Sequence, residues 1–182
     1  MTASQRARIP WPWVLTIVRI VLVVPVVWLT MLETPNASRV AFVTFAIAAF
    51  TDTLDGALAR KMDMVSSAGM LWDPIADKIL VLASMAALVI VGRFPAWAAI
   101  ILGVRELVIT WLRVSMERRG QGFPASKLGK IKTALELVAV LLFILPRDTV
   151  ASIIESGVLW LAVAAAIISG IDYLVRVRTR GR

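Results

Sequence analysis

The chain has 182 residues, of which 59% are hydrophobic, and its mean hydropathy is +0.84. Because a soluble domain is about 45–50% apolar, this composition predicts a membrane protein, with one compact domain over residues 1–182. The 20 Lys and Arg residues exceed the 12 Asp and Glu residues by a formal charge of +8, which in a membrane protein indicates cytoplasmic loops and anionic lipid rather than nucleic acid. The chain contains no cysteine and no histidine. Disulfides and thiolate chemistry are therefore excluded, and a general base must be Asp, Glu, Lys or Tyr.

Six apolar runs follow one another along the chain. Each approaches the ~20 residues that a helix needs to cross a bilayer, so we predict an all-α integral membrane protein with six transmembrane helices. The expected spans are approximately 13–32, 40–58, 71–91, 96–116, 128–145 and 150–175.

Positive charge is distributed unevenly between the two sides of this topology. Most Lys and Arg residues lie in the N-terminal segment, in the connections after the second and fourth runs, and in the C-terminal segment RVRTRGR. The opposite connections hold Arg39, Arg93 and Arg147. Because positively charged loops stay on the cytoplasmic side, we expect both termini in the cytoplasm.

Residues 52–77, DTLDGALARKMDMVSSAGMLWDPIAD, combine acidic and apolar residues at fixed spacing, D-x2-D-G-x2-A-R-x8-G-x3-D-x3-D. The four aspartates of this pattern are Asp52, Asp55, Asp73 and Asp77. On helices the first two are an i, i+3 pair and the last two an i, i+4 pair, so each pair shares one face. The predicted topology places both pairs at the cytoplasmic ends of their spans.

Carboxylates this close repel one another and are costly to desolvate unless positive charge lies among them. Oxygen ligands without histidine or cysteine suit one or two Mg2+ or Mn2+ ions. Such ions bridge phosphate oxygens and orient an in-line displacement, and at a lipid interface the phosphates would belong to a lipid or a lipid-linked nucleotide. The alternative is that these residues are ordinary surface acids of an amphipathic helix.

This spacing resembles the signature of the CDP-alcohol phosphotransferase family, and every fixed position of that signature is filled. In the family, a CDP-linked lipid or alcohol is the donor, a hydroxyl is the acceptor, and CMP leaves. The resemblance implies that Asp52, Asp55 and Asp73 are metal ligands. It implies that Asp77 is both a metal ligand and the catalytic base on the attacking hydroxyl. It assigns binding of the CDP-lipid to residues of the same window, namely Asp52, Gly56, Ala59, Arg60, Ser66 and Gly69. For Ser66, an ordinary loop serine is an open alternative.

Basic residues outside this window indicate the acceptor. Arg105 and Arg113 lie two turns apart in the fourth run, and Lys130 and Lys132 open the fifth. A charge inside a span is costly and suggests a functional site, and clustered cations near the carboxylates would bind an acceptor that carries its own phosphate. Two alternatives stay open: Arg105 could pair with an acid such as Glu106, and the two lysines could be anchors at the membrane surface.

The segments LTIVR, RELVITWLR and KLGKIKT are also similar to those of the bacterial phosphatidylglycerophosphate synthase branch of the family. This resemblance implies transfer of the phosphatidyl group from CDP-diacylglycerol to sn-glycerol 3-phosphate, forming phosphatidylglycerophosphate. It further implies a multi-pass homodimer in the cytoplasmic (inner) membrane of a bacterium, in contact with membrane lipid and with its active site at the cytoplasmic face.

Two other functions fit parts of the pattern. The same chemistry could use inositol phosphate, serine or phosphatidylglycerol as the acceptor. A cation transporter could instead use intramembrane acids to bind the transported ion, but it would place them at the bilayer midplane, often within inverted repeats. Here the acids gather near one interface, and the sequence shows no repeat.

Overall fold

The computed structural model describes residues 11–61, 69–118 and 127–180, with side chains over 17–51, 78–116 and 128–178. This part of the chain is entirely helical outside its short connections. The helices are α1 (Trp11–Met31), α2 (Pro35–Lys61), α3 (Gly69–Ile90), α4 (Ala96–Arg118), α5 (Lys127–Ile144) and α6 (Ser152–Arg180). The six predicted runs correspond one to one to these helices, which confirms the all-α prediction for the described residues.

Short turns with recognisable sequence signals reverse the chain between helices. At the start of α2, the hydroxyl of Thr34 accepts a hydrogen bond from the amide of Ala37 at 3.3 Å, and Pro35 is the first helical residue. This is the usual chemistry of a helix N-terminus. At the end of α3, Gly92 adopts a φ of 68°, a conformation that favours glycine, and the amide of Arg93 donates back to the carbonyl of Leu88 at 2.8 Å.

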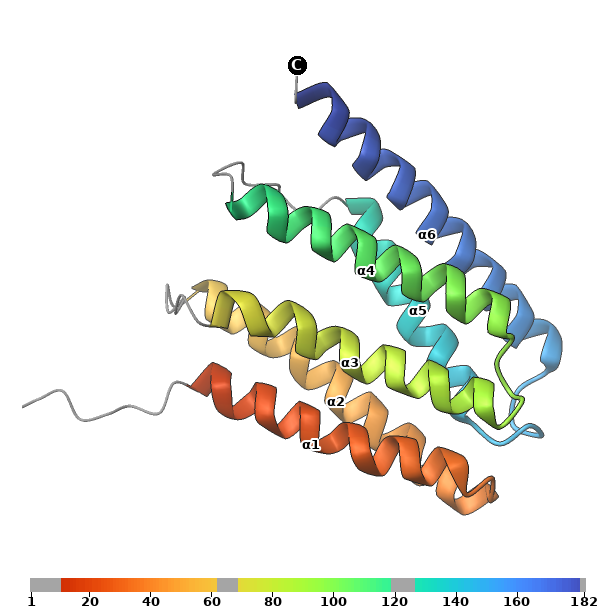
Figure 1. The fold of residues 1–182 in the computed structure, drawn as a ribbon. Helices are drawn as coiled ribbons and strands as arrows, with labels where there is room; N and C mark the ends of the chain where they lie inside the picture. Colours follow the sequence, from red (N-terminus) through yellow and green to blue (C-terminus); the bar gives the residue numbers. More distant parts are fainter. Residues whose placement is uncertain (1–10, 62–68, 119–126, 181–182) are drawn as a thin grey trace, which may run out of the picture.

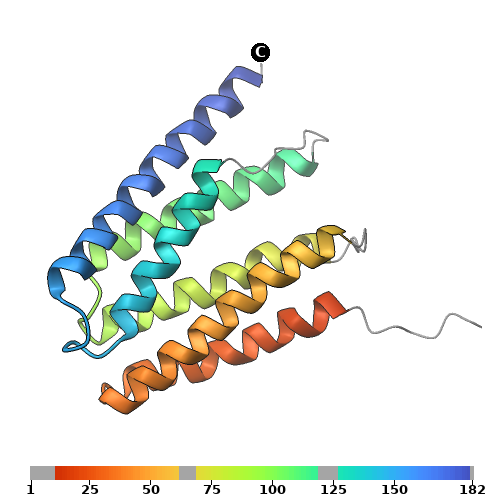
Figure 2. The same cartoon turned by 180° about the vertical axis from the view of Figure 1, so that it is seen from behind.

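Consecutive helices run in opposite directions and form two groups, α1–α3 and α4–α6 (Figure 1). Helix α1 packs against α2 and α3, whereas α6 packs against α4 and α5. The groups meet where α3 contacts α4 and where α5 contacts α2 and α3. One end of the bundle therefore contains the C-terminal ends of α2 and α4 and the N-terminal ends of α3 and α5 (Figures 1 and 2).

The described side chains place apolar groups outside and several charges inside. Trp111 on α4 is 69% exposed and Ile153 on α6 is 79% exposed, and large apolar side chains are exposed on every helix. Glu106 and Lys132 are buried. In soluble proteins, charged side chains are mostly exposed and large apolar side chains are mostly buried. The reverse distribution seen here fits a bundle surrounded by lipid.

One helix in the described part, α6 over Ser152–Arg178, is by itself long and apolar enough to cross a membrane. Two shorter apolar stretches lie in α1 and α3, over Ile17–Met31 and Lys78–Ile90. Charged residues interrupt the apolar character of the other helices, as Arg105 and Glu106 do within α4. The prediction of six membrane spans with cytoplasmic termini therefore stays a prediction.

Single cysteines introduced into this cysteine-free chain test the topology. Asn36 and Asp148 are exposed at one end of the bundle, and Arg178 is exposed near the opposite end. We expect Asn36→Cys and Asp148→Cys to react with an impermeant maleimide from outside intact cells. Arg178→Cys and Ser67→Cys should react only after the membrane is permeabilised. Labelling of Ser67→Cys in intact cells would contradict the cytoplasmic placement of the acidic motif.

Candidate active site

Both halves of the acidic motif are helical, as the spacing requires. Asp52 and Asp55 lie in the last turns of α2, and Asp73 and Asp77 lie in the first turns of α3. These turns belong to the same end of the bundle (Figures 1 and 2). The i, i+3 and i, i+4 relations predicted for the two pairs therefore hold on the backbone.

The side chains of the motif lie outside the described ones, and Ser66 lies wholly outside the described residues. The backbone places Gly56, Ala59 and Arg60 in α2, and Gly69 at the first position of α3. The assignment of these residues to the CDP-lipid, and of the aspartates to metal and catalysis, stays a prediction.

A cavity of about 220 Å³ begins one residue beyond the motif. Its polar lining comes from four helices: Arg19 on α1, Lys78 on α3, Glu106 on α4, and Thr133 and Glu136 on α5. Leucine, valine and alanine side chains form the rest of the wall. Because Lys78 directly follows Asp77 in the chain, the cavity adjoins the predicted catalytic helix.

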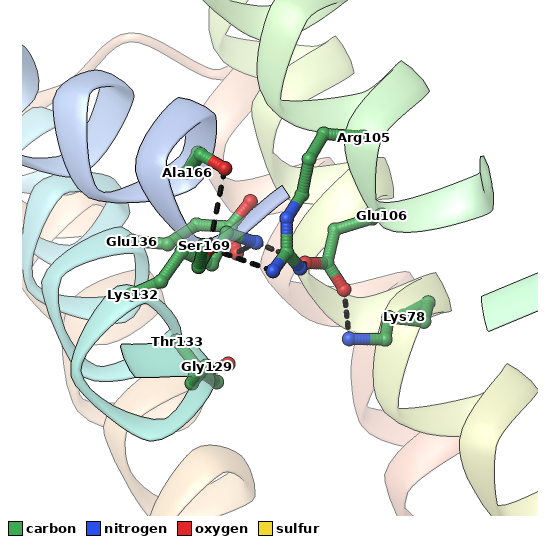
Figure 3. Close-up of polar contacts among 9 residues, drawn as sticks. All are labelled: Lys78, Arg105, Glu106, Gly129, Lys132, Thr133, Glu136, Ala166 and Ser169. Atoms are coloured by element: carbon green, nitrogen blue, oxygen red, sulfur yellow. Dashed lines mark hydrogen bonds and ion pairs between the residues drawn. The ribbon is translucent and has the colours of Figure 1, made fainter. Parts of the chain in front are cut away.

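The carboxylate of Glu106 is the centre of the polar contacts beside this cavity (Figure 3). Its Oε2 accepts a hydrogen bond from Lys78 Nζ. Its Oε1 accepts one from Lys132 Nζ and another from Arg105 Nη1 at 2.8 Å. The Glu106 side chain is 2% exposed, so all of these contacts form away from bulk water. One carboxylate thus joins cations from α3, α4 and α5.

Three further hydrogen bonds extend this network along α5 and to α6. Lys132 is fully buried and also donates to Glu136 Oε2, one turn along α5. Arg105 Nη2 donates to Ser169 Oγ at 2.8 Å, and that hydroxyl donates to the carbonyl of Ala166 at 3.1 Å. The network therefore fixes the relative positions of four helices.

Positive charge exceeds negative charge around the cavity. Arg19 and Lys78 line the cavity together with the carboxylates of Glu106 and Glu136. Two more cations, Arg105 and Lys132, do not line it but contact these carboxylates from behind, so four cations surround two carboxylates. Since buried charges are stable only when compensated, such a cavity favours an anionic ligand.

The structure brings together two of the four residues predicted to bind the acceptor phosphate. Arg105 and Lys132 share the carboxylate of Glu106, so the pairing of Arg105 with Glu106, left open by the sequence, is present. Lys130 is exposed, because two residues correspond to about 200° around a helix and place it away from Lys132. Arg113 is partly buried and makes no hydrogen bond or ion pair with another described residue.

The sequence alone assigned no role to three residues that line this cavity. Lys78 and Arg19 were not singled out as acceptor-binding residues, and Glu136 received no role. The available signal was a charge within an apolar run, as in IADKILVL for Lys78 and TALELVAV for Glu136. Such a charge suggests a buried partner, but the sequence does not say which one.

Removal of the central carboxylate should destabilise the protein. We expect Glu106→Gln to lower the free energy of unfolding by about 3–5 kcal/mol, because it leaves buried cations without their counter-charge. The control is Asp172→Asn, which breaks a single i, i+4 pair with Arg176 at 2.9 Å, where the arginine is 53% exposed. A pair of that kind contributes about 0–1 kcal/mol. Melting of both variants in detergent, followed by fluorescence-detected gel filtration, measures the difference, and equal melting temperatures would contradict this role of Glu106.

Comparison with known proteins identifies the family of this chain. Residues 10–168 match the CDP-alcohol phosphatidyltransferase family. The chain is 38% identical over 167 residues to a probable phosphatidylglycerophosphate synthase of Mycobacterium tuberculosis, covering 90% of this chain and 79% of that protein. It is 39% identical over 142 residues to a CDP-diacylglycerol–glycerol-3-phosphate 3-phosphatidyltransferase of Bacillus subtilis, covering 76% and 74% of the two chains. A protein of the same name from Rickettsia typhi is 30% identical over 172 residues, covering 92% and 97%. The resemblance carried by residues 52–77 is thereby confirmed, and the chain belongs to the CDP-alcohol phosphatidyltransferase family.

Proposed function

We propose that this protein transfers the phosphatidyl group of CDP-diacylglycerol to sn-glycerol 3-phosphate, releasing CMP and forming phosphatidylglycerophosphate. The names of its relatives support this reaction. The structural observation that carries the proposal is the cation-rich cavity at Lys78, directly beyond Asp77 on α3. A small phosphate ester can bind in this cavity next to the helix that carries the predicted catalytic base.

The protein would act as a multi-pass protein of the bacterial cytoplasmic membrane, with six membrane-spanning helices. The exposed apolar side chains on all six helices support contact with lipid on every side of the bundle. The charge distribution of the connections favours a cytoplasmic active site, on the side where nucleotides and glycerol phosphate are available. A homodimer is part of this proposal, on the basis of the resemblance to the family.

The acidic motif suits a divalent cation by the chemistry of its donors. Four aspartates, in a chain without histidine or cysteine, provide the oxygen ligands that Mg2+ and Mn2+ prefer. We propose that Asp52, Asp55, Asp73 and Asp77 hold one or two such ions. A bound ion would offset the negative charge of the CDP pyrophosphate.

Residues of the motif would also bind the CDP-lipid and remove the proton of the acceptor. Arg60 would bind the pyrophosphate of the CDP-lipid, and small residues such as Gly56 and Gly69 would let the nucleotide approach the backbone. Asp77 would accept the proton of the acceptor hydroxyl as its oxygen attacks the phosphatidyl phosphorus. The bond from that phosphorus to the CMP oxygen breaks, and CMP leaves with the electron pair.

The cavity would hold the phosphate of the acceptor and keep water away from the reacting phosphorus. Lys78 and Arg19, which line the cavity, would contact this phosphate, and Arg105 and Lys132, which were predicted for the role, would add positive charge from behind Glu106. An acceptor without a phosphate, such as serine, would leave the positive charge of the cavity uncompensated. The cavity therefore favours a phosphorylated acceptor, and the names of the relatives favour glycerol 3-phosphate.

An acceptor panel tests the proposed reaction. Purified protein receives CDP-diacylglycerol, Mn2+ and one of four acceptors: glycerol 3-phosphate, inositol phosphate, serine or phosphatidylglycerol. We expect the highest kcat/KM with glycerol 3-phosphate, measured as CMP release, with phosphatidylglycerophosphate as the lipid product. Faster turnover with any of the other three would contradict the proposed acceptor.

Titration with metal separates the base from the other aspartates. Asp77→Asn should reduce kcat by the ~10²–10⁴ typical of a lost general base, and added Mn2+ should not restore it. Asp52→Asn should instead weaken metal binding, so that a higher Mn2+ concentration restores part of the activity. EDTA should abolish turnover of the unmodified protein. Near-normal turnover of Asp77→Asn at high Mn2+ would show that Asp77 is only a ligand.

A further inference from the structure

Glu136 has one carboxylate oxygen that the described network leaves without a partner. Its side chain is 3% exposed, and its Oε2 accepts a hydrogen bond from Lys132. Its Oε1 is buried, and no described residue donates a hydrogen bond to it. A buried carboxylate oxygen without a donor is costly, and native proteins leave few such atoms. This oxygen therefore needs an explanation.

The position of Glu136 suggests where a donor would come from. The residue lines the 220 Å³ cavity together with Lys78 and Arg19. Both oxygens of the other lining carboxylate, Glu106, are already occupied by lysine and arginine donors. Among the described carboxylates of this cavity, Glu136 Oε1 is thus the one that can accept a hydrogen bond from a ligand.

The two kinds of group in the cavity can recognise different parts of a small molecule. Lysine and arginine are donors only, so they can bind phosphate oxygens, whereas an ionised carboxylate oxygen accepts a hydrogen bond from a hydroxyl. Two cations, Arg19 and Lys78, line the same cavity as Glu136. Cationic donors and a carboxylate acceptor in one cavity match a molecule that carries both a phosphate and a hydroxyl.

We infer that Glu136 Oε1 accepts a hydrogen bond from the acceptor's non-attacking hydroxyl and thereby selects a polyol phosphate over the phosphate ester of a simple diol. In glycerol 3-phosphate, this is the secondary hydroxyl, which lies between the attacking primary hydroxyl and the phosphate. The inference rests on the proposed function and adds a specificity-determining residue to it. Glu136 would contact the substrate without taking the proton that Asp77 removes.

The first arm of the test uses the unmodified protein and two acceptors. 3-Hydroxypropyl phosphate keeps the primary hydroxyl and the phosphate of glycerol 3-phosphate but lacks the secondary hydroxyl. Loss of a hydrogen bond to a charged group corresponds to a decrease in kcat/KM of about 10- to 150-fold. Equal kcat/KM for the two acceptors would overturn the inference. Absence of turnover with glycerol 3-phosphate would instead refute the proposed function, so the two failures are distinct.

The second arm removes the carboxylate. Glu136→Leu has no acceptor atom, so its kcat/KM ratio for the two acceptors should fall to about one. Glu136→Gln should reduce the ratio several-fold, because a neutral amide accepts a weaker hydrogen bond than a carboxylate. If the leucine variant does not fold, the glutamine variant tests the inference in its place. Asp172→Asn changes another carboxylate in an i, i+4 pair, one that does not line the cavity, and should keep the full ratio.

Both variants are checked for folding by gel filtration and by their KM for CDP-diacylglycerol. A merely structural Glu136 would lower turnover of both acceptors equally and leave their ratio as in the unmodified protein. That result would overturn the inference. A ratio near one, with KM for CDP-diacylglycerol unchanged, would support it.

Discussion

The arrangement of the second half of this bundle depends on the buried carboxylate of Glu106. Three cations from α3, α4 and α5 contact it, and each of them would be costly in a low-dielectric interior without a counter-charge. These cations are therefore compensated only if the helices that carry them pack together around Glu106. The helices must pack so that Lys78 and Lys132 reach one carboxylate, and the cavity lies beside that carboxylate.

Two oppositely charged regions meet on α3. Its first turns carry Asp73 and Asp77, whose chemistry suits a divalent cation and a pyrophosphate, and the next residue, Lys78, belongs to the cation-rich cavity. A phosphate-bearing acceptor and a nucleotide-linked donor repel each other in water. Separate sites of opposite charge on one helix can bind each of them and still hold the attacking hydroxyl close to the phosphorus.

The same buried charges shorten the uninterrupted apolar stretches of the helices that carry them. α6 contains a long apolar stretch between Glu155 and Asp172, whereas α4 and α5 carry charged residues that are buried inside the bundle. In α4 and α5, charged residues therefore interrupt the apolar run, although most of the residues around them are apolar. Their exposed apolar side chains, such as Val104 and Leu107 beside the buried Glu106, show that one helix can have an apolar outer face and still contain a buried charge.

The six helices could be predicted from the sequence, because each apolar run approaches the ~20 residues of a membrane-spanning helix. The sequence also determined the acidic motif, because Asp52 to Asp77 follow a spacing that is local in the chain. The partners of the buried charges were decided only by tertiary structure: Lys78 and Lys132 lie 28 and 26 residues from Glu106 and meet it through helix packing. Lys130 and Lys132 look equivalent in sequence, but the rotation of α5 exposes the first and buries the second. That rotation depends on contacts with α2, α3 and α6, which no local pattern specifies.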